Sequence, residues 1–260
     1  MVEDLKIALI QTDLVWEQPQ ANISALTQHI EAIREAVDLI VLPEMFSTGF
    51  TMNAQAQAET MDGPTVTWMQ NQALSKQTAI LGSLVITENE QYFNRLVFVY
   101  PNGEITTYDK RHTFTLAGED KVYTTGETRV ITYYKGWRLF PLICYDLRFP
   151  VWSRFQDDYD VLLYVANWPK PRIQAWDTLL RARAIENMSF SIGVNRVGTD
   201  AKGHEYVGHS AVYNPLGEVM SSFLPKENGI RIVVLHHNEL VAVREQFKFL
   251  DDRDAFNLLM

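Results

Sequence analysis

Mostly apolar runs of strand length alternate with helical segments over residues 6–86, and this alternation constrains the fold more than any other feature of the sequence. The runs at 6–11, 38–42 and 79–86 predict buried strands. Between them, apolar side chains recur at helical spacing after Pro19 and after Pro64, and proline suits the first turn of a helix. Strand–helix–strand order is typical of α/β proteins with parallel strands.

The same spacing predicts which side chains of the two helices face the core. The expected apolar faces consist of Ile23, Leu26, Ile30 and Ile33 in the first helix and of Val66, Met69 and Leu74 in the second. Both faces should cover a sheet.

The middle and the end of the chain add antiparallel strands. Pro-Asn-Gly at 101–103 and Lys-Gly at 135–136 are turn sequences, so the runs around them predict two hairpins, 92–100 with 104–108 and 129–134 with 137–143. Further strands are expected at 160–166, 190–194, 211–213, 218–223 and 230–235, and a further helix at 171–187. This mixture predicts a single α/β domain with a mixed sheet.

Length and charge narrow the classes of function. A chain of 260 residues, 47% of them hydrophobic, can bury roughly 70% of the surface that its unfolded form exposes, so it needs no staples. Its formal net charge of −9 disfavours binding to nucleic acid or to a membrane surface. The acidic start, the absence of an apolar run of ~18 residues and the single cysteine predict a cytoplasmic protein without signal peptide, membrane span or internal disulfide.

Three predicted strands lead into residues that can carry chemistry. Glu44 follows the run at 38–42, Lys110 follows the run at 104–108, and Cys144 follows the run at 137–143. Strand ends line the ligand crevice of α/β sheets. Taken one at a time, however, Glu44 and Lys110 also fit solvated loops, and a lone cysteine also fits a small buried hydrophobe.

Cys144 is the most informative of the three residues. It is the only cysteine, and it stands where a strand gives way to a polar turn, a geometry that exposes a nucleophile and directs the next backbone N–H toward an oxyanion. A neutral thiol, with an ordinary pKa of ~8.5, attacks amides poorly and needs a base or a nearby cation. Glu44 and Lys110 would supply these two groups.

Together the three segments resemble the nitrilase, or carbon–nitrogen hydrolase, superfamily. The resemblance rests on Leu-Pro-Glu-Met-Phe around Glu44, Tyr-Asp-Lys-Arg-His around Lys110 and Ile-Cys-Tyr-Asp-Leu-Arg-Phe-Pro around Cys144, and it extends from residue 7 to residue 218. It implies one carbon–nitrogen hydrolase domain over residues 1–260, folded as an α-β-β-α sandwich that forms a homodimer through its helices. The segment from about 236 to 260 is expected to contribute to packing or to the dimer interface, and no metal or other cofactor is implied.

The resemblance also implies a mechanism of amide hydrolysis. Cys144 would be the nucleophile and Glu44 the general base, while Lys110 and the backbone N–H of Tyr145 would hold the oxyanion. Glu119, nine residues after Lys110, resembles the further acid that many members use to hold the lysine and the substrate amide. Ammonia would leave, and Glu44 would then activate water against the thioester.

The motif around Cys144, with Asn-Trp-Pro at 167–169, looks most like that of bacterial omega-amidases, which act on 2-oxoglutaramate and similar 2-oxo acid amides. The expected substrate is therefore the omega-amide of a small 2-oxo dicarboxylic acid. Deaminated glutathione, or another small aliphatic amide or carbamoyl compound, is the alternative substrate. A non-catalytic binding protein on the same fold is a more distant alternative.

A substrate carboxylate needs a cationic partner in a largely apolar pocket. Arg172 is the first candidate for this partner, with Trp168 and Phe46 as walls. Arg148 competes for the role, although it also fits a structural pairing with Asp146.

Two other mechanisms use the same residue types. A papain-like hydrolase would pair Cys144 with a histidine, and His112, His204 and His209 are available, but the Cys-Gly-x-Cys context of that family is missing. A metal hydrolase is disfavoured because the sequence has no His-Glu-x-x-His and no paired cysteines.

Overall fold

The computed structural model describes residues 2–156 and 158–258. The strands are β1 (Leu5–Gln11), β2 (Leu39–Val41), β3 (Ala79–Glu88), β4 (Gln91–Val99), β5 (Ile105–Asp109), β6 (Thr132–Tyr134), β7 (Trp137–Ile143), β8 (Val161–Ala166), β9 (Phe190–Asn195), β10 (Val197–Thr199), β11 (Glu205–Val207), β12 (Ala211–Tyr213), β13 (Val219–Ser222) and β14 (Gly229–Leu235). The α-helices are α1 (Pro19–Ala32), α2 (Ala54–Gln57), α3 (Pro64–Lys76), α4 (Pro150–Ser153), α5 (Ile173–Asn187) and α6 (His237–Phe247). Short 3-10 helices are η1 (Thr115–Ala117), η2 (Glu119–Lys121), η3 (Cys144–Arg148), η4 (Lys170–Arg172) and η5 (Phe249–Asp252).

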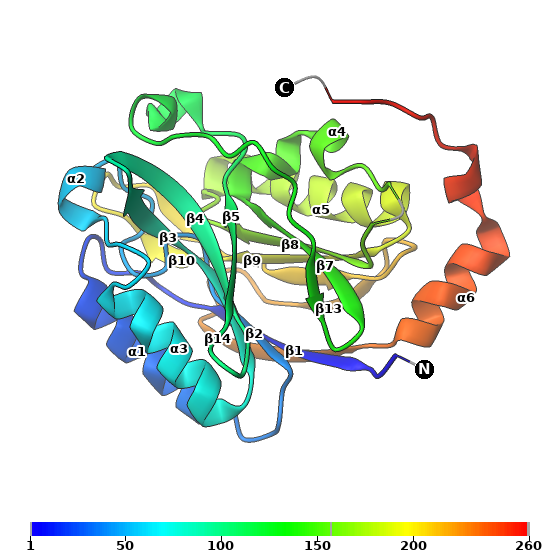
Figure 1. Ribbon diagram of the computed structural model, residues 1–260, viewed down its shortest axis with the longest axis horizontal. Coiled ribbons are helices and arrows are strands. Elements are labelled where there is room, and N and C mark those ends of the chain that lie inside the picture. Colours follow the sequence, from blue (N-terminus) through cyan, green and yellow to red (C-terminus); the bar gives the residue numbers. More distant parts are fainter. Residues whose placement is uncertain (1, 157, 259–260) are drawn as a thin grey trace.

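Within these residues twelve strands form two six-stranded mixed sheets with helices on their outer faces, and β10 and β11 form a separate two-stranded sheet (Figure 1). The first sheet has the order β14-β1-β2-β3-β4-β5, and the second has the order β13-β12-β9-β8-β7-β6. In each sheet three consecutive strands are parallel, namely β1-β2-β3 and β7-β8-β9, and antiparallel strands complete both edges.

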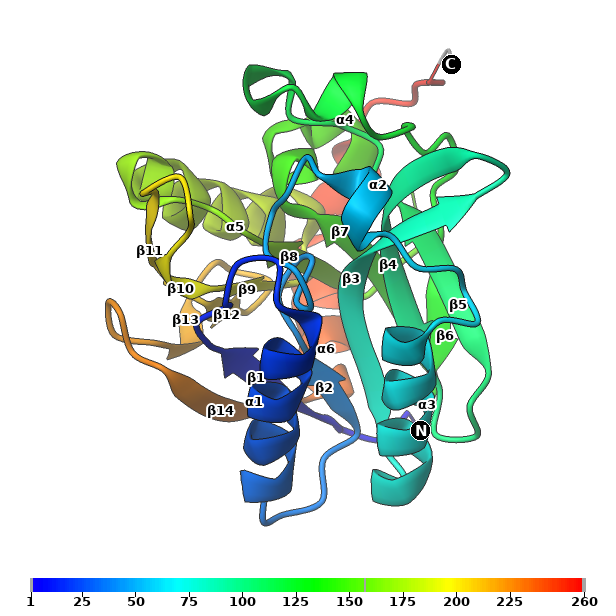
Figure 2. The ribbon, with the colours of Figure 1, turned by 90° about the vertical axis from the view of Figure 1, so that its left-hand side faces the viewer.

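Helices α1 and α3 lie side by side and cover the outer face of the first sheet (Figure 2). Leu26 and Ile30 of α1 and Val66 and Met69 of α3 pack there in one apolar cluster with alternate residues of β1, such as Ile10. Side chains of a strand point alternately to its two faces, so the intervening residues of β1 face the other sheet.

The largest apolar cluster fills the space between the sheets and continues under α5. Ile7 of the first sheet and Leu139 of the second belong to it, as do Trp176 and Leu180 of α5. Helix α5 approaches β9 so closely that a Cβ atom at Gly193 would lie 2.4 Å from Leu180 Cδ1. The predicted α-β-β-α sandwich is confirmed.

An ionic cluster of the buried Asp160 with the partly exposed Arg138 and Arg244, here called the Asp160 cluster, joins α6 to the second sheet. Asp160 Oδ1 accepts hydrogen bonds from Arg138 Nη2 at 2.6 Å and from Arg244 Nη1 at 3.2 Å. Arg244 also donates to the carbonyl oxygens of Tyr159 and Met188. These guanidinium groups outweigh the burial of Asp160, which by itself favours the neutral acid, and they lower its pKa.

Most predicted elements agree with the structure, and the differences have local causes. Leu74, expected in the core, is 45% exposed because α3 turns its Val66, Met69 and Ala73 face to the sheet and leaves Leu74 beside Gly103 of the β4–β5 turn. The strand predicted at 129–134 is shorter, because only Thr132–Tyr134 pairs with β7. The helix predicted at 171–187 begins with η4 and becomes α-helical at Ile173.

The fold brings together strand ends from both sheets. Glu44 follows β2 and Lys110 follows β5 in the first sheet, whereas Cys144 follows β7 and Asn167 follows β8 in the second. Because β7 and β8 are parallel neighbours, with Ile143 opposite Val165, Cys144 and Asn167 lie at the same end of their strands. These strand ends of the second sheet meet those of the first sheet, and the candidate site lies there.

Candidate active site

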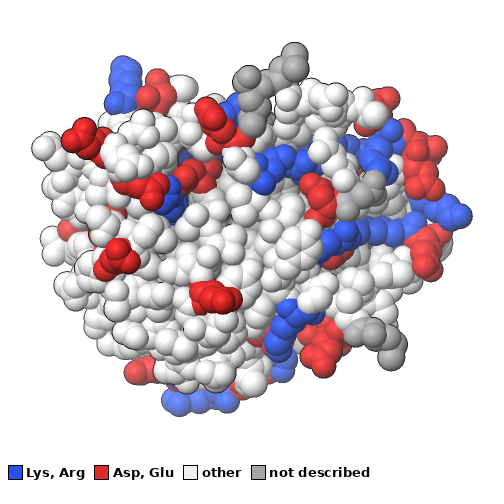
Figure 3. All heavy atoms as spheres, viewed as in Figure 1, with Lys and Arg blue, Asp and Glu red and all other residues white. Residues whose placement is uncertain are grey.

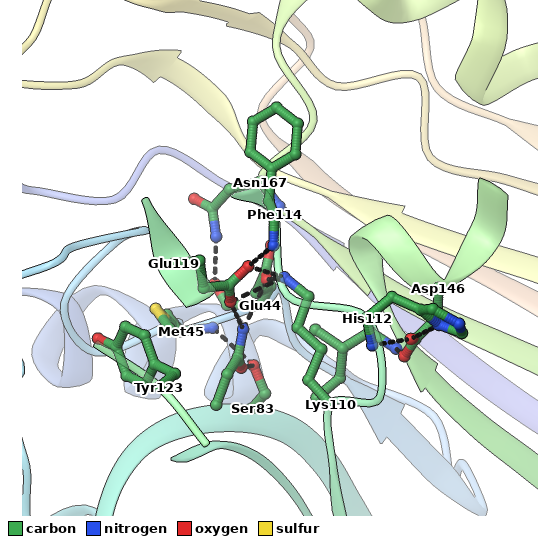
Figure 4. Close-up of polar contacts among 12 residues, drawn as sticks. Glu44, Met45, Ser83, Lys110, His112, Phe114, Glu119, Tyr123, Asp146 and Asn167 are labelled. Atoms are coloured by element: carbon green, nitrogen blue, oxygen red, sulfur yellow. Dashed lines mark hydrogen bonds and ion pairs between the residues drawn. The ribbon is translucent and has the colours of Figure 1, made fainter. Parts of the chain in front are cut away.

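Glu44 is fully buried and surrounded by hydrogen-bond donors (Figure 4). Its Oε1 accepts from Lys110 Nζ at 3.0 Å and from Asn94 Nδ2 at 2.8 Å, and its Oε2 accepts from the Asn167 backbone N–H at 2.7 Å. Asn167 Nδ2 donates to the Glu44 carbonyl oxygen, so the end of β8 holds both the backbone and the side chain of Glu44. The carboxylate is thereby fixed in one orientation.

Lys110 is buried between two carboxylates. Its Nζ lies 3.0 Å from Glu44 Oε1 and 2.9 Å from Glu119 Oε2. Burial favours the neutral amine, but Glu119 and Glu44 outweigh it and raise the pKa of Lys110. Lys110 therefore remains an ammonium at neutral pH.

Glu119 occupies the first position of η2, after Gly118 in the left-handed conformation (φ 77°). It is fully buried, and it accepts hydrogen bonds from Lys110 and from the Phe114 backbone N–H. Burial raises the pKa of Glu119 and Glu44 adds to the effect, while Lys110 opposes it. One ammonium thus pairs with two carboxylates and balances only one of their charges. The cluster therefore favours binding of a proton or of a further hydrogen-bond donor.

Asn94 and Ser83 support the cluster from beneath, and sequence reasoning missed both. Asn94 Nδ2 donates to Glu44 Oε1 and, at 3.2 Å, to Glu119 Oε1. Asn94 Oδ1 accepts from Ser83 Oγ, which in turn accepts from the Met45 backbone N–H, both at 2.9 Å. The available signal was a pair of polar residues inside strands that are otherwise apolar, because buried polar groups need partners.

Cys144 is the first residue of η3 and has a φ of 44°, the left-handed conformation that side chains other than glycine seldom adopt. Its thiol is in hydrogen-bonding contact with the Glu44 carboxylate. Burial raises the pKa of Cys144 well above its ordinary value, Glu44 and Glu119 raise it further, and Lys110 counteracts them in part. The resting thiol is therefore protonated at neutral pH.

Cys144 opens onto a cavity of about 350 Å³. Its lining combines apolar side chains with basic and polar ones. The lining residues are Phe50, Met52, Phe114, Leu116, Ala117, Cys144, Tyr145, Arg148, Asn167, Trp168, Pro169, Arg172, Asp200, Lys202, His204 and Tyr206. A mostly concave, partly apolar site with a few charged groups suits a small polar ligand.

The model of the carbon-nitrogen hydrolase family matches residues 6–245 of the sequence. The chain belongs to this family. Within the family it is 45% identical to the omega-amidase YafV of Escherichia coli K12 over 255 residues, which cover 98% of each chain. It is 32% identical to the 2-oxoglutaramate amidase of Bacillus subtilis, with 95% of this chain and 96% of that one covered.

Solved structures of the carbon–nitrogen hydrolase superfamily have the same fold. XC1258 from Xanthomonas campestris, whose crystal structure has an arsenic adduct in the active site, superposes with a TM-score of 0.95 at 39% identity, covering 98% of this chain and 99% of that one. Nit3 of Saccharomyces cerevisiae superposes with a TM-score of 0.85 at 19% identity, covering 95% of each chain.

Four of the five predicted substrate-binding residues of this carbon–nitrogen hydrolase line the cavity, namely Tyr145, Arg148, Trp168 and Arg172. The prediction for Phe46 is wrong. Phe46 is fully buried in the cluster between the first sheet and its helices, where it contacts Trp68, because the turn after β2 directs it into the core. Phe50 lines the cavity in its place.

The expected pairing of Arg148 with Asp146 is also wrong. The oxygens of Asp146 accept instead from Tyr108, His112 and Ile143. The Arg148 guanidinium lies over the Trp168 ring, 4.8 Å from its centroid, and the Arg172 guanidinium lies 5.0 Å from the centroid of Phe114. Among residues 2–156 and 158–258, neither guanidinium has a hydrogen bond or an ion pair.

The three histidines considered for a papain-like mechanism each have a different partner. His112 Nδ1 contacts Asp146, His204 Nδ1 contacts Asp200, and His209 Nδ1 contacts Asp177. The thiol of Cys144 contacts Glu44 instead. In the described part of the chain, no cluster of three or more His, Cys, Asp or Glu side chains is placed to hold a metal ion, and no helix is long and apolar enough to cross a membrane.

Proposed function

We propose that this carbon–nitrogen hydrolase cleaves the omega-amide of a small 2-oxo dicarboxylic acid, such as 2-oxoglutaramate, to ammonia and the free acid. The observation that carries the proposal is a single cavity with two features. Its lining contains a cysteine in contact with the Glu44–Lys110–Glu119 cluster and two arginines without ion-pair partners among the described residues. The names of the relatives, omega-amidase and 2-oxoglutaramate amidase, support the same substrate class.

The first step is nucleophilic attack by Cys144 with Glu44 as general base. Because the resting thiol is protonated, its proton passes to Glu44 as sulfur attacks the amide carbon, and no free thiolate accumulates. The oxyanion that forms is stabilised by the Lys110 ammonium and by the Tyr145 backbone N–H.

The second step releases ammonia and then the acid. Glu44 returns its proton to the amide nitrogen, the carbon–nitrogen bond breaks, and an acyl thioester remains on Cys144. Glu44 then takes a proton from water as the water oxygen attacks the thioester carbon, the carbon–sulfur bond breaks to release the acid, and Glu44 returns the proton to sulfur to restore the thiol. Glu119 holds Lys110 in place and is proposed to accept a hydrogen bond from the N–H of the substrate amide.

Arg172 and Arg148 are proposed to bind the end of the substrate that carries the carboxylate. A cation without a competing carboxylate, placed over an aromatic ring, keeps its N–H donors available and its charge partly desolvated. Arg172 remains the first choice, because it follows β8 at the same edge as Asn167.

The distribution of charge argues against nucleic acid as a substrate. The formal net charge is −9, and on the face shown in Figure 3 basic side chains are interspersed with acidic ones.

We also propose a cytoplasmic homodimer, in which exposed apolar residues near the C-terminus, such as Phe249, contribute to the interface. Sedimentation at micromolar concentration tests this, since a monomer there would contradict it.

The substrate class is tested by ammonia release. The purified protein is assayed with 2-oxoglutaramate, 2-oxosuccinamate, deaminated glutathione, glutamine and a simple nitrile. We expect the highest kcat/KM for the 2-oxo acid amides and no turnover of the nitrile. A preference for deaminated glutathione would transfer the proposal to the alternative substrate, and inactivity with every compound would support a binding protein.

A further inference from the structure

Asp146 is a fully buried carboxylate outside the Glu44–Lys110–Glu119 cluster, and its side chain ties together the two segments that carry Cys144 and Lys110 (Figure 4). Its Oδ2 accepts from the Ile143 backbone N–H at 3.0 Å, next to Cys144. Its Oδ1 accepts from the backbone N–H and from Nδ1 of His112 at 2.9 Å and 2.8 Å, two residues after Lys110. Two segments from different sheets are thereby held by one side chain.

The hydroxyl of Tyr108 completes this arrangement. It donates to Asp146 Oδ2 at 2.8 Å and accepts from the Arg111 backbone N–H and from Trp152 Nε1. Four donors therefore surround Asp146, two from backbone and two from side chains. A carboxylate with this many donors is costly to rotate or remove.

The nucleophile needs such support because its backbone is strained. A side chain in the left-handed region costs about 1–2 kcal/mol, so Cys144 with φ 44° relaxes unless its neighbours hold it. The bond between Asp146 and Ile143 fixes the residue immediately before the strained position. Any relaxation would move the thiol away from Glu44 and Lys110.

We propose that Asp146 and His112 are a positioning pair, which holds the Cys144 turn at its working distance from Lys110 without touching the substrate. His112 is suited to this role and not to proton transfer. Its ring is stacked on Phe149, with centroids 3.8 Å apart, and its Nδ1 is engaged by Asp146. This inference rests on the proposed function where it is tested by ammonia release, whereas its test by alkylation of Cys144 needs no substrate.

Two substitutions of His112 separate the hydrogen bond from the ring. His112→Asn places an amide Nδ2 where Nδ1 stands and can still donate to Asp146, but it removes the stacking on Phe149. His112→Phe keeps an aromatic ring over Phe149 and removes the donor. We expect kcat for ammonia release to fall about 10- to 100-fold in His112→Phe, with KM within about threefold, and to stay within about threefold of wild type in His112→Asn.

Alkylation by iodoacetamide gives a readout that does not depend on the substrate. Because Cys144 is the only cysteine, incorporation of label measures this residue alone. The alkylation rate should fall in His112→Phe and recover in His112→Asn, in parallel with kcat. If the wild type releases no ammonia from any amide, the proposed function fails, whereas the positioning role is still decided by the labelling rates.

Three results would overturn the positioning role. Both variants could keep wild-type kcat and labelling rates after correction for thermal stability, which would make the network purely structural. Both could lose activity equally, which would assign the effect to the ring. Tyr108→Phe, which removes a second donor to Asp146, should lower kcat about 3- to 30-fold, and a wild-type value there would also contradict the proposal, even if His112→Phe does not fold.

Discussion

The Glu44–Lys110–Glu119 cluster and the Asp160 cluster are both ionic and both contain buried carboxylates, but their charge balance is opposite. In the first, two carboxylates share one ammonium, and in the second, two guanidinium groups share one carboxylate. The pKa of Glu119 is raised by burial, whereas the pKa of Asp160 is lowered by Arg138 and Arg244 in spite of burial. One cluster retains a tendency to take up protons, and the other is fully satisfied.

Under the proposed function, this contrast separates a site for proton transfer from one that serves stability. A carboxylate that must accept and return a proton cannot be saturated with cations, because its basicity would be lost. A carboxylate that joins a helix to a sheet has no such limit. The predictions below test this difference, starting with the largest expected effect on rate.

Cys144→Ala should abolish turnover, with kcat lowered more than about 10⁴-fold, because no other side chain can form the thioester. Its circular dichroism spectrum and thermal unfolding should remain close to wild type, since alanine fits the same backbone. Cys144→Ser is the matched variant and should bind substrate without useful ammonia release. Substantial hydrolysis by Cys144→Ala would remove the thioester mechanism.

Lys110→Met should lower kcat/KM about 10³-fold, because it removes an oxyanion partner, and Lys110→Arg should recover little, since a planar guanidinium cannot replace a compact ammonium. Glu44→Gln should be comparably inactive. Near wild-type kcat/KM in Lys110→Met would require another source of oxyanion stabilisation.

The same Lys110→Met variant should show a distinctive pH dependence of stability. Lys110 opposes the rise in the pKa of Glu119, so without the ammonium burial and the neighbouring Glu44 carboxylate should raise the folded pKa of Glu119 further above its unfolded value. The variant therefore keeps its stability below the unfolded carboxyl pKa and loses stability as the pH rises through the raised folded value. Urea unfolding should show a larger deficit at pH 8 than at pH 5, and equal deficits would mean that the carboxylates are not coupled.

Arg172→Ala should narrow the preference for acids over neutral analogues. The wild type should favour a 2-oxo acid amide over its carboxyl ester by roughly tenfold to a hundredfold in kcat/KM, and the variant should lose most of this ratio by penalising the acid alone. Parallel kinetics with both substrates measure it. An unchanged ratio would assign the role to Arg148, whose alanine variant is the control.

Asp160→Asn should leave kcat per folded molecule unchanged and lower the free energy of unfolding by about 2–4 kcal/mol at pH 7. Because the folded pKa of Asp160 is lowered, its contribution is present above the unfolded pKa of 3.8 and is lost as pH falls through the folded value. Urea unfolding should therefore show wild type and variant converging in acid, opposite to Lys110→Met. A loss of kcat would mean that this cluster also serves catalysis.

Apolar runs of strand length were enough to predict β1, β3, β7 and β8 and a single α/β domain with a mixed sheet. The sandwich was predicted only through the resemblance of three motifs to carbon–nitrogen hydrolases, and the structure places the residues of those motifs, Glu44, Lys110 and Cys144, close together. The orientation of a side chain after a strand leaves no comparable signal in the sequence. Phe46 was misplaced because the turn at Met45, with a φ of 41°, determines which of Phe46 and Phe50 reaches the cavity.

Partners of buried polar groups were equally hidden. Asp146 was considered as a partner of Arg148, its near neighbour in sequence, but two of its donor residues, Tyr108 and His112, lie more than thirty residues away. Likewise, the contact between Asn94 and Glu44 joins β4 to the turn after β2. Such long-range pairs depend on the packing of strands and on their register, which a local pattern does not determine.

The hydrogen bond from the Met45 backbone N–H to Ser83 fixes the direction of the hydrogen bonds that Ser83 and Asn94 make toward the Glu44–Lys110–Glu119 cluster. An amide N–H can only donate, so the Ser83 oxygen accepts there and sends its own hydrogen to Asn94 Oδ1. The amide of Asn94 is thus prevented from flipping, and both carboxylates meet its NH₂ group and never its oxygen. A backbone N–H group therefore fixes, through two neutral side chains, which group of Asn94 faces Glu44. A change of pH near neutrality does not alter this order of donors and acceptors, because the backbone amide, Ser83 and Asn94 do not ionise there.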